Sequence, residues 1–192
     1  MLSRFTIPFE ILYKSPYIIS MSKFDIVYAT NPFLSQPCKD VTKVDRDMPK
    51  LIKDMFDTMY KEDGCGLAAP QIGLDQNIFI VDVSYAHTDT TPMALINPKF
   101  TWASDTLCTK EEYCISVPGS GVKITRPEEV KVDYVNEHGE PQSLHASGLL
   151  ARCLQHENDH LRGVTLLDYM SSLRRKMAAK KIIKFEKLLK EG

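Results

Sequence analysis

Residues 155–163 read Gln-His-Glu-Asn-Asp-His-Leu-Arg-Gly, and this stretch decides how the rest of the chain is interpreted. His156 and His160 are four positions apart, with Glu157 directly after the first histidine. Residues four apart lie on one face of a helix, so both imidazoles can bind a single metal ion with Glu157 beside them. The pattern favours metal-assisted hydrolysis, although such five-residue matches also arise by chance in helices whose histidines are ordinary surface or core residues.

A catalytic site of this kind needs a third protein ligand and one open position for water. In the thermolysin-like and metzincin arrangements, the third ligand is a glutamate or histidine that follows the HExxH pair. Here residues 161–166 contain a glycine but no third histidine. The missing ligand must therefore come from another part of the chain, and Cys114 is a candidate because thiolates bind iron and zinc.

The spacing of apolar residues predicts three helices. One runs over 149–161 and carries the HExxH motif, and an earlier one runs from Asp47, a candidate N-cap, to about Lys61. A last helix begins near Ser172. Its expected apolar side consists of Ala178, Ile182, Phe185 and Leu189.

Strand-like runs at 77–83, 93–96, 111–117 and 130–135 lie between the first two helices, with a hairpin turn at 137–140. A helix followed by strands and then by helices indicates an α+β domain rather than an alternating parallel sheet. We expect small mixed or antiparallel strands packed around a central HExxH metal-binding helix, with a C-terminal helix. The length predicts one domain, over residues 21–192.

Composition argues against several classes of partner. The formal net charge of −1 gives no global field that would attract the chain to nucleic acid or to an anionic membrane. No apolar run reaches the roughly 18–20 residues of a membrane-spanning helix. The five cysteines form no dense disulfide framework, which is typical of a reducing compartment. We therefore expect a cytoplasmic protein without a membrane or a sequence-specific nucleic acid as partner.

Residues 1–20 differ from the rest because they carry Arg4, Lys14 and several serines but only one acidic residue, Glu10. Two interpretations stay open. The segment is either an N-terminal extension ahead of Met21 or an organelle presequence, which would place the protein in an organelle.

Three motifs in the chain resemble those of the peptide deformylase family, bacterial type. Residues 64–73 (GCGLAAPQIG) are similar to GxGLAAxQ, residues 112–116 (EYCIS) to EGCxS, and residues 155–163 to QHExDHLxG. The resemblance spans roughly Lys23 to Tyr169. It implies removal of the N-formyl group from the formyl-methionine of nascent polypeptides, with release of formate.

The resemblance also implies roles for individual residues. Cys114, His156 and His160 would bind the metal, with water in the fourth position. Glu157 would take a proton from that water and pass it to the leaving amine. The side-chain amide of Gln71 and the backbone N–H of Ile115 would donate hydrogen bonds to the oxygen of the tetrahedral intermediate.

Other residues are assigned to the surroundings of the metal. Glu112 resembles a family carboxylate that pairs with an arginine equivalent to Arg126 and braces the cysteine segment. Helical steps back from His156 reach the residues expected to line an apolar slot for the methionine side chain. This methionine slot consists of Leu149 and Cys153 with Cys65 and Gly66, although Leu149 could equally be an ordinary core residue. Arg152 would border the slot or touch the substrate backbone, with its charged head in water.

The ion itself is not determined by these ligands, since two imidazoles and a thiolate accept iron, zinc, nickel and cobalt. The resemblance favours Fe²⁺, with Zn²⁺, Ni²⁺ or Co²⁺ as alternatives in purified protein. The C-terminal helix is rich in lysine and arginine, which is typical of a solvated face. Bacterial relatives imply a second interpretation, in which this helix contacts the ribosome.

One residue departs from the family pattern, because Tyr113 stands where EGCxS has glycine. If residues 111–117 are extended, Tyr113 and Cys114 point to opposite faces, so the ring need not enter the metal site. Two other functions remain as alternatives. One is an HExxH zinc endopeptidase, and the other is a catalytically inactive metal-binding paralogue.

Overall fold

The computed structural model describes residues 24–86 and 90–191, so the extension expected over residues 1–20 lies outside the described residues. The helices are α1 (Met48–Lys61), α2 (Gly148–Leu161) and α3 (Ser172–Glu191), with short 3-10 helices at Pro32–Ser35, Ala69–Ile72 and Leu166–Tyr169. The strands are β1 (Gly66–Ala68), β2 (Ile78–Val81), β3 (Met93–Ala103), β4 (Leu107–Glu112), β5 (Val122–Pro127), β6 (Glu129–Val135) and β7 (Pro141–Ser147).

Five strands form an antiparallel sheet in the order β1-β2-β3-β6-β7, and β4 pairs with β5 in a separate antiparallel ribbon. The predicted turn at 137–140 joins β6 to β7. There the side-chain oxygen of Asn136 accepts hydrogen bonds from the backbone N–H groups of His138 and Glu140, both at 3.0 Å. Gly139 takes the positive φ of 82° that this turn requires. The expected α+β class with antiparallel strands is confirmed.

Strand β2 separates two parts of the core. Successive side chains of a strand point to opposite faces, and all four residues of β2 are buried. Ile78 and Ile80 pack with Met55 on α1, whereas Phe79 and Val81 belong to the cluster that includes residues of α2. The apolar run at 77–83 therefore forms a strand with a helix on each side.

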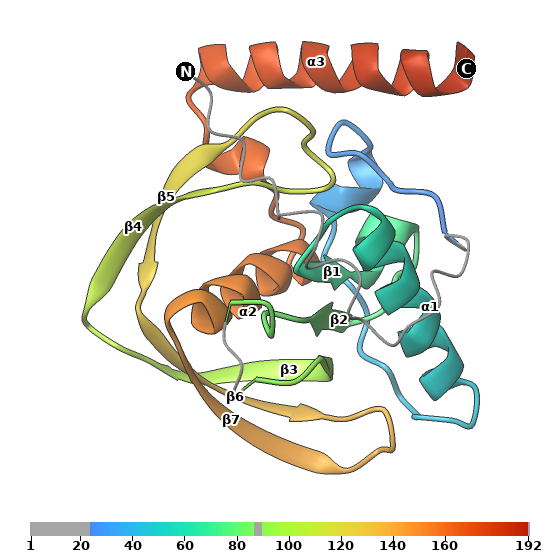
Figure 1. The fold of residues 1–192 in the computed structure, drawn as a ribbon, viewed down its shortest axis with the longest axis vertical. Helices are drawn as coiled ribbons and strands as arrows, with labels where there is room; N and C mark the ends of the chain where they lie inside the picture. The colour runs from blue at the N-terminus through green and yellow to red at the C-terminus, as the bar shows by residue number, and fades with distance from the viewer. Residues whose placement is uncertain (1–23, 87–89, 192) are drawn as a thin grey trace.

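Helix α2 lies at the centre of the molecule, between the sheet and the curved β4–β5 ribbon (Figure 1). Ala151, Leu154 and Leu161 are buried against the strands. Burial of a leucine side chain contributes about 1.5–3 kcal/mol, so this apolar face fixes the rotation of the helix. As a result the HExxH residues face the ends of β1 and β4.

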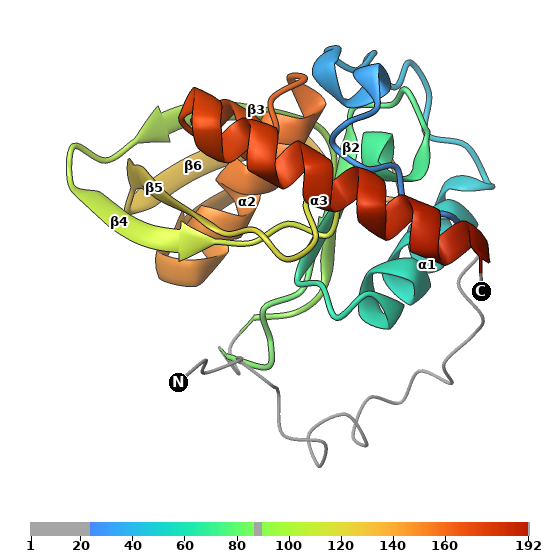
Figure 2. The same ribbon diagram turned by 90° about the horizontal axis from the view of Figure 1, so that it is seen from above.

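Helix α3 crosses one side of the molecule (Figures 1 and 2). It makes fewer contacts with the rest of the chain than α2 does. Ala178 and Ile182 are buried in an apolar cluster that also contains Val122 and Ile124 of β5, but Phe185 and Leu189 of the predicted apolar side are exposed. The expected apolar side is thus confirmed only in its first half. Within the described residues, no helix combines the length and the apolar character needed to cross a membrane.

Two strand predictions were wrong in their bounds. The strand expected at 111–117 ends at Glu112, because the chain then turns and the N–H of Val117 donates to the carbonyl of Cys114. The strand expected at 93–96 continues to Ala103. Pro98 is accommodated by a register shift in the pairing with β6 and by a positive φ of 51° at Asn97.

Candidate active site

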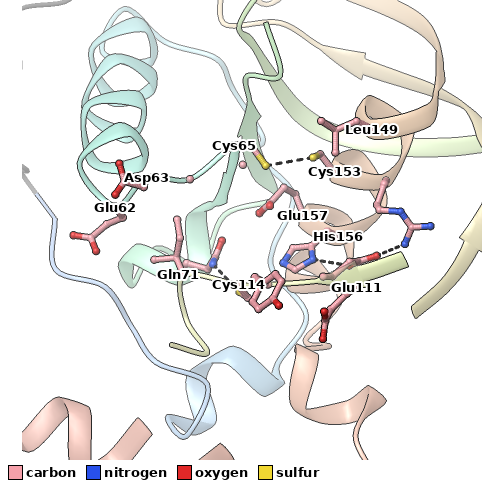
Figure 3. Close-up of a pocket in the computed structure, with 16 residues that line it drawn as sticks. Glu62, Asp63, Cys65, Gln71, Glu111, Cys114, Leu149, Cys153, His156 and Glu157 are labelled. Atoms are coloured by element: carbon pink, nitrogen blue, oxygen red, sulfur yellow. Dashed lines mark hydrogen bonds and ion pairs between the residues drawn. The ribbon is translucent and has the colours of Figure 1, made fainter. Parts of the chain in front are cut away.

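The three sequence motifs meet at one pocket, a cavity of about 400 Å³ (Figure 3). One wall comes from the turn that leads into β1, a second from the residues that follow β4, and a third from α2. The residues assigned from the sequence that line the cavity are Cys65, Gly66, Gln71, Glu112, Cys114, Ile115, Leu149, Arg152, Cys153, His156 and Glu157.

The predicted ligands lie close enough to share one ion. The candidate ligand atoms of Cys114, His156 and His160 are all within 4.8 Å of one another. The Cys114 Sγ atom is 3.2 Å from His160 Nε2. The cysteine comes from the turn after β4 and both histidines come from one face of α2, as the spacing of four residues predicts.

Glu112 orients His156 for metal binding. Arg126 donates to both Glu112 oxygens, at 2.7 and 3.0 Å, and Arg152 donates to one of them at 2.6 Å. Burial alone would raise the pKa of Glu112, but the hydrogen bonds with His156 and Arg126 lower it to about 2. Glu112 is therefore ionised, and His156 Nδ1, 2.9 Å away, must carry the proton. This leaves the lone pair of His156 Nε2 available for an ion.

The Glu112–Arg126 pair expected from the sequence is thus present, and it extends further than expected. Arg126 Nη1 lies 2.9 Å from Asp159, whose carboxylate also accepts from the Tyr169 hydroxyl at 2.7 Å. Sequence reasoning gave Asp159 no role, although its place between the two histidines could have indicated one. The network braces α2 against the β4–β5 ribbon.

The expectation that the head of Arg152 stays in water is wrong. Its guanidinium is buried and donates to the carbonyl oxygens of Cys108, at 2.6 Å, and Ile124, at 3.2 Å, as well as to Glu112. Arg152 still lines the pocket. These protein acceptors occupy the N–H groups of the guanidinium. We therefore interpret Arg152 as a residue that braces the site.

Glu157 is buried beside the ligands, and one of its oxygens, Oε2, has no hydrogen-bond partner among the described residues. Burial raises the pKa of Glu157 well above its ordinary value, and a thiolate at Cys65 would act in the same direction. A Cβ atom on Gly66 would lie 2.3 Å from Glu157 Oε1 and 2.9 Å from its Cγ. Only glycine therefore allows the chain to pass so close to this carboxylate.

Gln71 both caps a turn and points into the site. Its side-chain oxygen accepts from the backbone N–H of Ala68 at 2.8 Å, at the start of the 3-10 helix Ala69–Ile72. This contact directs its Nε2 toward Ser116 Oγ, at 3.2 Å, and Cys114 Sγ, at 3.5 Å. Capping and catalytic interpretations of Gln71 are therefore compatible. Ser116 belongs to the second motif, but no role was predicted for it. In the structure its hydroxyl oxygen accepts the hydrogen bond from Gln71 Nε2.

Tyr113 lies at the rim of the pocket rather than over the metal ligands. Its side chain is 66% exposed, and a Cβ atom on Gly121 would be only 2.7 Å from its ring. The ring thus covers Gly121, and the nearby Glu111 raises the pKa of its hydroxyl. The extended geometry assumed for residues 111–117 was wrong, but the ring lies outside the Cys114, His156 and His160 cluster.

The chemistry of these residues fits a bound divalent ion. Burial raises the pKa of the Cys114 thiol and lowers the pKa of His160, so both groups favour their neutral forms without a cation nearby. A cation would stabilise the thiolate and keep the imidazole neutral. The orientation of His156 by Glu112 is the second requirement of a metal site that the structure meets.

An HExxH helix that brings two histidines, a cysteine and a buried glutamate to one pocket is the arrangement of a metal-dependent hydrolase. The model of the family described as polypeptide deformylase matches residues 23–176. The chain belongs to this family.

Curated relatives and solved structures agree with the family model. The chain is 45% identical to peptide deformylase 1 of Nostoc sp. over 141 residues, which is 73% of this chain and 75% of the relative. It is 41% identical to the peptide deformylase of Agrobacterium fabrum over 159 residues, 83% of this chain and 94% of the relative. The fold also matches a crystal structure of peptide deformylase from Ehrlichia chaffeensis, with a TM-score of 0.81 and 37% sequence identity. The match covers 86% of this chain and 97% of the Ehrlichia chain.

Proposed function

We propose that this chain hydrolyses the N-formyl group of formyl-methionyl peptides and releases formate and a free amino terminus. The observation that carries the proposal is the convergence of Cys114, His156 and His160 beside the buried Glu157, in a cavity of about 400 Å³. The substrate class is the amino-terminal end of newly made proteins.

Cys114, His156 and His160 would hold one divalent ion, with Glu112 fixing the orientation of His156. When bound, the ion acts as a Lewis acid that lowers the pKa of water in the site and stabilises negative charge on oxygen. Arg126 and Arg152 keep Glu112 ionised, so they support the ligand set from behind.

Glu157 would act as general base and then as general acid, because its carboxylate is buried next to the ligands and one oxygen has no partner within the described part of the chain. Gln71 Nε2 already points toward Cys114 and would donate to the oxygen on which negative charge develops. The backbone N–H of Ile115 would be the second donor. Loss of one such donor typically lowers the rate by about 10²–10³.

The methionine side chain would occupy the methionine slot of Cys65, Gly66, Leu149 and Cys153, with Arg152 at its border. All four residues line the cavity. Leu149 and Cys153 come from α2, and Cys65 faces Cys153 from the turn before β1 (Figure 3). Their mostly apolar character suits an unbranched thioether, which fills irregular apolar space well.

Formate release separates this function from the alternatives. The metal-loaded protein should release formate from formyl-Met-Ala, leave acetyl-Met-Ala intact, and not cut a longer peptide blocked at both ends. Internal cleavage of the blocked peptide would indicate an endopeptidase. A metal-loaded protein that acts on none of the three substrates would be an inactive paralogue.

We infer that the cellular ion is Fe²⁺, because the family resemblance favours it and the thiolate of Cys114 accepts it. Protein purified without oxygen should contain iron and lose activity in air, since a ferrous ion and a thiolate both oxidise. Activity should return when the reduced protein is given Ni²⁺ or Co²⁺. Elemental analysis beside the formate assay tests this inference, and an iron form stable in air contradicts it.

Two wider proposals concern the surroundings of the enzyme. A contact between α3 and ribosomal phosphates is supported by the exposed basic residues Lys180, Lys181, Lys184 and Lys187. Co-sedimentation with ribosomes that falls as salt increases would test it, with Lys181→Glu and Lys184→Glu as weakened variants.

A cytoplasmic location is proposed because the cysteines form no dense disulfide framework, which is typical of a reducing compartment. An organelle is the alternative if residues 1–20 are a presequence.

A further inference from the structure

Two thiols meet in the wall of the methionine slot. Cys65 Sγ and Cys153 Sγ are 3.4 Å apart, although the residues are 88 positions apart in the sequence. Figure 3 shows the two sulfur atoms pointing toward one another, one from the turn before β1 and the other from α2. Neither sulfur belongs to the cluster of Cys114, His156 and His160, so the proposed hydrolysis does not use them as ligands.

The two thiols are suited to different roles. Cys65 is partly exposed at the pocket, whereas Cys153 is buried. The hydrogen bond with Cys153 lowers the pKa of Cys65, against the opposite effect of burial, and the same hydrogen bond together with burial raises the pKa of Cys153. Cys65 is therefore the thiol that can be reached first, and Cys153 is the partner placed directly behind it.

We propose that Cys65 and Cys153 form a reversible disulfide that closes the methionine slot. The oxidant is a small-molecule disulfide of the glutathione class. The Cys65 thiolate attacks one sulfur of the oxidant and forms a mixed disulfide, with release of one thiolate. The Cys153 thiol then loses its proton and attacks Cys65 Sγ, which forms the Cys65–Cys153 bond and releases the second thiolate. Two cysteine thiols are oxidised, and one molecule of the oxidant is reduced to two thiols.

Closure follows from the geometry of the slot. A disulfide requires the sulfur atoms to approach from 3.4 Å to about 2.0 Å, which draws the segment around Cys65 toward α2. Gly66, the next residue, already lies so close to Glu157 that a Cβ atom would be 2.3 Å from its Oε1. The bond therefore narrows the slot directly beside the catalytic carboxylate. This consequence rests on the proposed function, but formation of the bond does not.

Mass spectrometry of the metal-loaded protein tests the bond without any substrate. Treatment with oxidised glutathione should remove two thiols per chain and produce a linked pair of proteolytic peptides that contain Cys65 and Cys153. Cys153→Ser should stop at one glutathionyl group on Cys65. Cys65→Ser should form no internal link, which keeps the test decisive if one variant does not fold. A variant with both Cys38→Ser and Cys108→Ser is the matched control and should form the link as the wild type does.

The kinetic result tests the closure. The oxidised wild type should show at least a tenfold lower kcat/KM on formyl-Met-Ala, restored by a reductant, while its metal content stays constant. A link that involves another cysteine, or two thiols that remain free, would overturn the disulfide. A complete link with unchanged kcat/KM would overturn the closure of the slot. A reduced protein without any formate release would instead overturn the proposed function and leave the mass result to decide the disulfide.

Discussion

The carboxylate of Glu157 has the position expected of a proton carrier, because it is buried beside the ligands without belonging to them. We predict that Glu157→Gln retains its metal but loses activity by about 10²–10⁴, the usual contribution of general acid–base catalysis. The amide keeps the shape of the side chain and removes the proton-accepting oxygen. The measurements are formate release and metal content of the same sample.

His156→Ala is the control for that prediction, since it removes a ligand and should lose both the ion and the activity. The two variants together separate binding of the ion from transfer of the proton. Near wild-type rates in metal-loaded Glu157→Gln would show that another group moves the proton.

Tyr113 is the residue that departs most clearly from the family pattern, and its exposure indicates a modest effect. We predict that Tyr113→Gly changes kcat/KM on formyl-Met peptides by less than about tenfold, which corresponds to about 1.4 kcal/mol. The ring lies over Gly121 at the rim, outside the ligand cluster. Steady-state kinetics of both proteins check this. An inert wild type, loaded with metal and rescued by the glycine, would mean that the tyrosine blocks catalysis.

At the scale of elements, long periodic segments were predictable and short irregular ones were not. The α2 helix could be placed from its spacing because its apolar face packs against the sheet over its whole length. The strand β1 could not, since Gly66-Leu67-Ala68 has low strand propensity and becomes a strand only through pairing with β2. The strand β5 was also missed. It pairs with β4, whose own prediction extended too far into the turn that carries Cys114.

The candidate site was likewise predictable where it depends on local spacing and unpredictable where it depends on packing. The ligands on α2 could be predicted from one helix because local spacing determines which face they share. Contacts between distant segments, such as Cys65 with Cys153 or Asp159 with Arg126, depend on how α2 packs against the strands. No local pattern contains that information, so these contacts became visible only in the structure.

Helix α3 should depend on a single buried position for much of its attachment. Ile182 is fully buried in the cluster that includes Val122 and Ile124 of β5, whereas its neighbour Ile183 is 59% exposed. We predict that Ile182→Ala lowers the free energy of unfolding by about 2–5 kcal/mol through the lost burial and the cavity that remains. The matched variant Ile183→Ala should change it by about 0.5 kcal/mol or less. Urea unfolding of the two variants measures the difference, and equal losses would show that α3 packs differently.

For the molecule as a whole, we predict that a chain beginning at Met21 folds and retains its activity. The family model begins to match at residue 23, and every assigned site residue lies beyond it. The expected result is the same thermal unfolding temperature and the same rate of formate release as the full chain. Aggregation, or a large loss of activity, would show that residues 1–20 are integral to the domain.

The order of the elements along the chain has a consequence for synthesis. Helix α2 follows all the strands, yet it covers the face of the sheet formed by Phe79 and Val81 and supplies two of the three candidate ligands. While the ribosome is still making the strands, that apolar face has no cover, and an unfinished chain is open to aggregation or to chaperones. The candidate ligand cluster likewise cannot form until His160 has been synthesised, 46 residues after Cys114. Metal loading is therefore confined to the last stage of the protein's own production.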